Sequence, residues 1–140
     1  MRHILVTLAF LLIAIACAPV TEMSLRQQKS EKQRSFNVER PYKAVFQTIL
    51  DKSRVCFLDK ASDVQFTVVG NSVNKTKTAE IVVAEVYGLN GREVLMLIDV
   101  LAINDNETQI KTYHVSRNAE SYVSNIRSWL DDENSSCSAT

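Results

Sequence analysis

The chain has 140 residues, with 16 Lys and Arg against 16 Asp and Glu, so its formal net charge at pH 7 is zero. This length suffices for one folded domain and is short for two. A near-neutral chain without a basic stripe lacks the electrostatic signature of a nucleic-acid-binding protein, so we expect no nucleic-acid partner.

The first sixteen residues have the pattern of a secretory signal peptide. Arg2 gives a basic tip, and an apolar run follows from Ile4 to Ala16. The run is shorter than the roughly 20 apolar residues that span a bilayer. We therefore expect residues 1–16 to be removed. Because Arg2 leaves with them, 15 basic and 16 acidic side chains remain, and the formal charge becomes −1.

The segment that ends at Cys17 reads Ile-Ala-Ile-Ala-Cys and resembles the lipobox of bacterial lipoproteins. In that family the cysteine thiol receives a diacylglyceryl group, the signal is cut before it, and the new amino terminus is acylated, typically with palmitate. The resemblance implies that Cys17 carries lipid and anchors the protein to a membrane. Ala18 follows in place of Asp, which implies the outer membrane, facing the periplasm, if the source is Gram-negative.

Two other fates of this segment stay open. Ala14 stands where most lipoboxes carry Leu, Ile or Val. Ala14-Ile15-Ala16 also fits the A-x-A site of ordinary secretion, which would cut the same bond. The second of these fates is that the segment remains uncleaved and acts as an anchor.

Residues 17–34 are predicted to form a flexible tether after the lipidated cysteine. Apolar residues are sparse and unpatterned there, so the segment buries too little surface to offset its ordering entropy. Such a tether would hold the domain some 20 to 25 Å from the bilayer. Its basic residues could contact anionic headgroups, although an ordinary solvated linker is the simpler interpretation.

The folded domain is predicted to begin at Ser35 with a short strand and a helix. Phe36 and Val38 alternate with polar residues, as in a strand. Pro41 then opens a helix, where its missing N–H is tolerated. The apolar residues at helical spacing are Tyr42, Val45, Phe46, Ile49 and Leu50. Cys56 continues this stripe two turns after Ile49.

From residue 64 to 115 the apolar period changes to two, and clusters of Gly, Asn and Asp divide the stretch into four strands. The predicted strands cover 64–73, 78–88, 91–103 and 108–115. Hairpin turns are expected at Leu89-Asn90-Gly91 and Asn104-Asp105-Asn106. The third strand is almost continuously apolar around Ile98, which indicates a central position in the sheet.

A second amphipathic helix is predicted after Val115, with Ser116 or Asn118 as its N-cap. Its apolar stripe consists of Ala119, Tyr122, Val123, Ile126, Trp129 and Leu130. It ends in an acidic run at residues 131–133, which suits the helix dipole poorly because a C-terminus favours cations. Residues 134–140 form a C-terminal tail.

The remaining cysteines, Cys56 and Cys137, are predicted to form a disulfide. If Cys17 carries lipid, these two are left as a pair in an oxidising compartment. Two separate thiols or a metal site are the alternatives. His114 is the one histidine outside the signal, and the spacing is poor for zinc. We therefore expect neither a metal nor a cofactor.

The order strand, helix, four strands, helix predicts a single α+β domain over residues 35–133, with an antiparallel sheet and both helices packed on one face. Phe46, Ile49, Val123 and Ile126 should then cover Ile98. This order resembles the helix-grip and TATA-binding-protein-like domains of several bacterial lipoproteins, including those of BamC in the outer-membrane assembly machinery. The resemblance implies a fold and not a function.

We find no enzyme signature in the sequence. His114 lies close to Ser116, and Asp99 could complete a Ser-His-Asp set, but no Gly-x-Ser-x-Gly elbow is present. Glu85 and Asp99 interrupt apolar strands and could meet as paired carboxylates, although solvated strand residues explain both. We expect a protein that is not an enzyme.

The sequence is therefore interpreted as a lipid-anchored envelope protein that binds an envelope partner without catalysis, as a protein-interaction or envelope-assembly module. Its candidate interaction surface is the free face of the sheet, where Leu95, Leu97 and Leu101 are expected to form an exposed apolar patch. The alternative is a periplasmic binding domain for a small apolar ligand held between sheet and helices. A cavity of about a few hundred Å³ would favour the ligand, and a filled core the partner.

Overall fold

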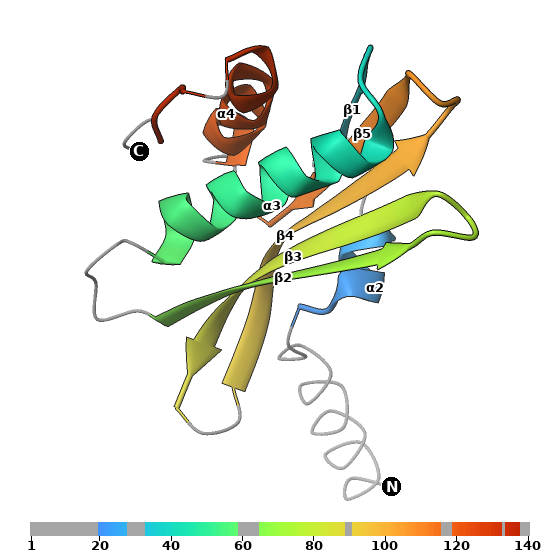
Figure 1. The fold of residues 1–140 in the computed structure, drawn as a ribbon. Helices are drawn as coiled ribbons and strands as arrows, with labels where there is room; N and C mark the ends of the chain where they lie inside the picture. Colours follow the sequence, from blue (N-terminus) through green and yellow to red (C-terminus); the bar gives the residue numbers. More distant parts are fainter. Residues whose placement is uncertain are drawn as a thin grey trace, which may run out of the picture.

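The computed structural model describes residues 20–27, 33–58, 65–88, 91–115, 119–132 and 134–137; the predicted signal peptide and Cys17 lie outside them. The fold is α+β, as predicted. The described strands form a five-stranded antiparallel sheet. Figure 1 shows the long helices α3 and α4 on one face of it and the short helix α2 on the other. The elements are α2 (Glu22–Arg26), β1 (Gln33–Val38), α3 (Tyr42–Leu58), β2 (Gln65–Val73), β3 (Thr78–Tyr87), β4 (Gly91–Ala102), β5 (Thr108–His114) and α4 (Ala119–Asp131).

The strand order β1-β5-β4-β3-β2 makes β4 the central strand, as its apolar run predicted. Strands β2 to β5 follow one another as antiparallel neighbours, and β1 adds to the free edge of β5. The predicted turn after β4 is present, with the backbone N–H of Asn106 donating to the Asn104 side chain at 2.9 Å. The predicted turn at Leu89-Asn90-Gly91 lies partly outside the described residues.

Helices α3 and α4 pack on one side of the sheet and form the main core with it. Ile49 and Ile126 are fully buried in the same cluster as Ile98, and Phe46 packs against its edge. The predicted packing of both helices over the central strand is confirmed for these residues. At Gly70 of β2, a Cβ atom would lie 2.8 Å from the methyl groups of Leu50, so the glycine permits α3 to approach the sheet closely.

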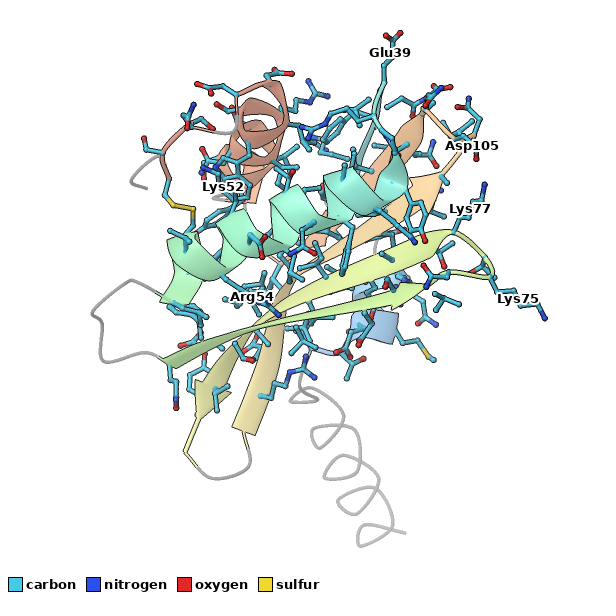
Figure 2. The ribbon with its side chains drawn as sticks, in the orientation of Figure 1. Glu39, Lys52, Arg54, Lys75, Lys77 and Asp105 are labelled. Atoms are coloured by element: carbon cyan, nitrogen blue, oxygen red, sulfur yellow. A yellow bond between two sulfur atoms is a disulfide. The ribbon has the colours of Figure 1, made fainter. Side chains whose placement is uncertain are left out.

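The C-terminal segment is held against α3. Cys56 and Cys137 form a disulfide with a Cα–Cα distance of 5.5 Å, visible as the yellow bond in Figure 2. Lys52 donates to the backbone carbonyl of Ser135 at 2.9 Å. The acidic end of α4 also receives a cation, because the Arg40 guanidinium donates to the Leu130 carbonyl at 2.9 Å.

The prediction of a flexible tether over 17–34 is wrong for residues 20–27 and for the start of β1. Thr21 and Ser24 form a capping box that begins α2. Leu25 is only 1 % exposed because it packs on the sheet. A single buried leucine, together with the ion pairs described below, therefore orders a segment whose sparse apolar content predicted disorder. Residues 17–19 and 28–32 of that prediction lie outside the described residues.

Strand β4 contains a β-bulge at Leu95. Its neighbours Val94 and Met96 pair with two consecutive residues of β3, so Leu95 has no partner on that strand. Side chains alternate between faces along a strand, and one extra residue reverses the alternation. Val94 and Leu97, three positions apart, consequently lie on the same face and in the same cluster.

Candidate functional site

The face of the sheet opposite α3 and α4, which we call the α2 face, is covered over only part of its length. Leu25 packs there on a small cluster that consists of Val82, Ala84, Val94, Leu97 and Tyr113. Among the described helices, α2 lies on this face (Figure 1), where it packs against β4 and β5, and an open groove lined by Val73 and Leu101 lies beside it. The α2 face therefore has a covered half and an open half.

The predicted interaction patch falls on this face but is only partly available. Leu97 is 0 % exposed because α2 covers it, so the expectation of an exposed side chain is wrong there. Leu95 is the bulge residue and is half-buried. Leu101, also half-buried, lines an open groove beside α2. Of the three leucines, Leu101 alone remains a candidate for direct contact in this groove.

The groove has a volume of about 360 Å³ and combines charged with apolar walls. The residues that line it include Arg26, Asn71, Val73, Glu80, Asp99 and Leu101. Val73, at the end of the edge strand β2, is 53 % exposed and forms an apolar wall. The charged wall consists of the carboxylates of Glu80 and Asp99, which lie between the apolar wall and α2. The groove thus places apolar surface beside two carboxylates and the cation that pairs with them, Arg26, and these three groups together carry one net negative charge.

Arg26 joins α2 to both carboxylates. Its Nη2 and Nε donate to Asp99 at 2.7 and 3.3 Å, and Nη2 also donates to Glu80. The hydrogen bonds to Asp99, with a smaller contribution from Glu80, raise the pKa of Arg26 above its ordinary value, so the guanidinium stays charged. At the other end of α2, Arg92 pairs with Glu22 at 3.2 Å. The short helix is thus held by ion pairs at both ends and by one leucine between them.

The carboxylate pair considered from the sequence, Glu85 with Asp99, is not formed. Glu85 lies opposite Glu93 in the register, whereas Asp99 lies opposite Glu80. Without the bulge, the register of the Glu85–Glu93 pair would place Ala79 opposite Asp99. The bulge shifts the register by one residue, so Glu80 lies there instead. Glu80 lies on the α2 face through the regular alternation of β3, together with Val82 and Ala84, and the bulge in β4 brings Asp99 to the same face beside it.

Glu80 was not singled out from the sequence, and Arg26 was considered there only as one of the basic residues of the tether. Glu80 interrupts an apolar strand in the same way as Asp99, and a lone acid in such a strand signals a cationic partner. The signal for Arg26 is weaker, since only the Thr21-x-x-Ser24 spacing marks the helix that carries it.

The Ser-His-Asp arrangement considered from the sequence is not formed. His114 lies opposite Met96, which belongs to the main core under α3 and α4, and it is 3 % exposed. Asp99 points to the α2 face, where it binds Arg26. His114 and Asp99 are therefore on opposite faces of the sheet, and Ser116 lies outside the described residues.

Within the described part of the chain, no three His, Cys, Asp or Glu residues gather closely enough to hold a metal ion. Among the helices that the structure describes, none has the length and apolar character needed to cross a membrane. No model of a known protein family matches the chain, and no curated protein is significantly similar to it. A function must therefore be argued from the chain's own residues.

Proposed function

We propose that the protein is a lipid-anchored component of the cell envelope, and that the groove on its α2 face binds another envelope protein without catalysis. The lipobox-like segment ending at Cys17 supports the anchor, and Ala18 favours the outer membrane in a Gram-negative source. The observation that carries the binding function is the open groove, in which the carboxylates of Glu80 and Asp99 lie beside the exposed Val73 and the half-buried Leu101.

The groove suits a polypeptide segment that places an apolar side chain next to a cationic one. Helix α2 gives an example of this recognition within the chain, since Leu25 is buried on the sheet while Arg26 binds Glu80 and Asp99. Val73 and Leu101 offer the apolar contact in the open half. Charge complementarity of this kind gives a surface specificity for its partner.

A small apolar ligand between sheet and helices has less support. That space holds side chains of the main core, and Ile49, Ile98 and Ile126 are each 0 % exposed. A ligand site there would require several of these side chains to move, which close packing opposes.

The anchor is tested by labelling cells with a palmitate analogue and comparing the native chain with Cys17→Ser. We expect the native protein to be labelled and to sediment with membranes, and the variant to lose both properties. Unchanged membrane association and an unchanged mass of the mature variant would refute the lipoprotein assignment.

The groove is tested with a photo-crosslinking amino acid at Val73, and with the same amino acid at Val55 on α3 as the control. The two valines are 53 and 56 % exposed, so differences in reactivity report location and not accessibility. We expect one defined adduct from Val73 that is lost when Leu101 is changed to Glu. Equal adducts from both positions, insensitive to Leu101→Glu, would exclude the groove as the binding surface.

A further inference from the structure

The first described residue, Val20, has a fixed place on the sheet. Its carbonyl accepts the backbone N–H of Val94 in β4 at 3.2 Å. The ion pair between Glu22 and Arg92, and the burial of Leu25, hold the next turn of chain against the same strands. The described chain is therefore held at one defined point beside the first half of β4, which we call the exit point.

This exit point lies three residues after Cys17, the lipidation site of the proposed function. A fully extended chain covers at most about 3.6 Å per residue, so three residues reach about 11 Å. Without the docked helix, the 16 residues from Cys17 to Gln33 would form the tether, with a root-mean-square length of about 20 to 24 Å. Docking of α2 thus shortens the connection to the lipid by about half or more.

The exit point also selects one end of the domain. Val94 lies close to the hairpin that joins β3 to β4, where Tyr87 is 50 % exposed. The opposite end carries the ion pair between Lys77 and Asp105, labelled in Figure 2. The eight residue steps from Val94 to Ala102 along β4 separate the two ends by about 27 Å.

From the proposed lipid anchor and this geometry, we propose that docked α2 holds the domain against the membrane surface, with the β3–β4 hairpin facing the lipid headgroups and the groove opening away from them. The contact follows from the short connection and not from charge, because the hairpin carries Glu85 and Glu93 opposite each other. The partner of this surface is accordingly a zwitterionic headgroup layer.

The test uses the lipidated protein in phosphatidylcholine vesicles that carry a nitroxide on a fraction of the headgroups. A fluorophore is placed at Tyr87→Cys or, as the matched control, at Asp105→Cys, with the Cys56–Cys137 disulfide intact. Because a nitroxide quenches only nearby fluorophores, we expect at least about threefold stronger quenching at position 87. A ten-residue Gly/Ser insertion after Ala18 should abolish the difference, since it lengthens the connection before α2.

The same insertion within residues 28–32 is the decisive control, because it lengthens the chain after α2 and should leave the difference unchanged. Equal quenching at positions 87 and 105 in the vesicle-bound native protein would overturn the inference, as would equal effects of the two insertions. Failure of the native protein to bind vesicles would instead refute the lipid anchor, and the inference would fall with it.

Discussion

The two faces of the sheet bury apolar side chains by different means. Among the described residues, 17 buried side chains form one cluster under α3 and α4, whereas six form the cluster under α2. The larger cluster is covered by helices of 17 and 13 residues and tied by a disulfide. The smaller one is covered by a helix of five residues that rests on one leucine and two sets of ion pairs.

Because of this difference, a mutation on one face should destabilise the whole fold, whereas a mutation on the other should destabilise only a local part of it. Loss of a side chain in the larger cluster weakens every element that packs on it. On the α2 face, α2 can undock locally while the rest of the domain stays folded. A substitution there can therefore cost at most the free energy with which α2 docks. A surface that binds partners is drawn from such weakly held regions, so the contrast can be tested residue by residue.

The largest effect is expected from Ile98→Ala in the main core. Truncation of a fully buried isoleucine should lower the free energy of unfolding by about 2 to 5 kcal/mol, measured by denaturant unfolding with Trp129 fluorescence as the probe. Ile103→Ala, at a position that is 49 % exposed, is the control and should change stability little. An unchanged midpoint for Ile98→Ala would contradict the packing of both helices over β4.

The disulfide should contribute the next largest effect on the same face. Its cysteines are 81 positions apart, so the bond restricts the unfolded chain strongly. We expect removal of the bond to cost about 2 to 4 kcal/mol. The measurement is unfolding of the native chain with and without reductant, with the double variant Cys56→Ala/Cys137→Ser as the control that reductant should not affect. A native chain that is equally insensitive to reductant would show that the bond contributes nothing.

A smaller and local effect is expected from Leu25→Ala on the α2 face. The burial of one leucine is worth about 1.5 to 3 kcal/mol, and α2 can undock before the rest unfolds. Hydrogen exchange of the Val94 amide, which donates to Val20, should accelerate, while that of Ile81 in β3 should not. Equal acceleration at both amides would show that the two faces unfold together.

The smallest expected effect is on the ionisation of two tyrosines, Tyr113 under α2 and Tyr87 away from it. Burial raises the pKa of Tyr113 under α2, with Asp99 adding to the shift. A hydrogen bond with Glu85 raises the pKa of Tyr87 to about 12, away from α2. Since a raised tyrosine pKa stabilises the folded form below its ordinary value of about 10, docking of α2 should weaken as the pH rises through the pKa of Tyr113.

Ultraviolet titration with Leu25→Ser checks this expectation. The variant exposes Tyr113, so its ionisation should move down toward pH 10, while the ionisation of Tyr87 stays in place. A fall in the pKa of both tyrosines would show that the variant disturbs the whole sheet.

The elements that could be predicted from sequence are those that local periodicity specifies. The apolar spacing around Ile49 predicted α3, and the alternation of period two predicted β2 to β5. In both cases neighbouring residues carry the signal. These are also the elements that build the larger cluster. The disulfide was predicted by cysteine count, because Cys56 and Cys137 are the pair that remains when Cys17 carries lipid.

The candidate site could not be predicted in the same way because its contacts are long-range. Arg26 is separated from Asp99 by 73 positions and from Glu80 by 54 positions, and no local pattern marks those pairings. In β4 the apolar run hides the bulge, because alternation cannot be followed where residues on both faces are apolar. The free face was therefore expected to be bare, and Glu85, not Glu80, was the residue considered as a neighbour of Asp99.

Because of the bulge at Leu95, the register of the sheet depends on the number of residues in β4 as well as on which residues they are. Another apolar residue at this position would leave the register intact, since Leu95 has no partner on β3. Loss of one residue there would send Asp99 to the face of α3 and leave Arg26 with Glu80 as its remaining carboxylate partner among these two. Across evolution, we expect this strand to tolerate substitutions at position 95 and to reject deletions.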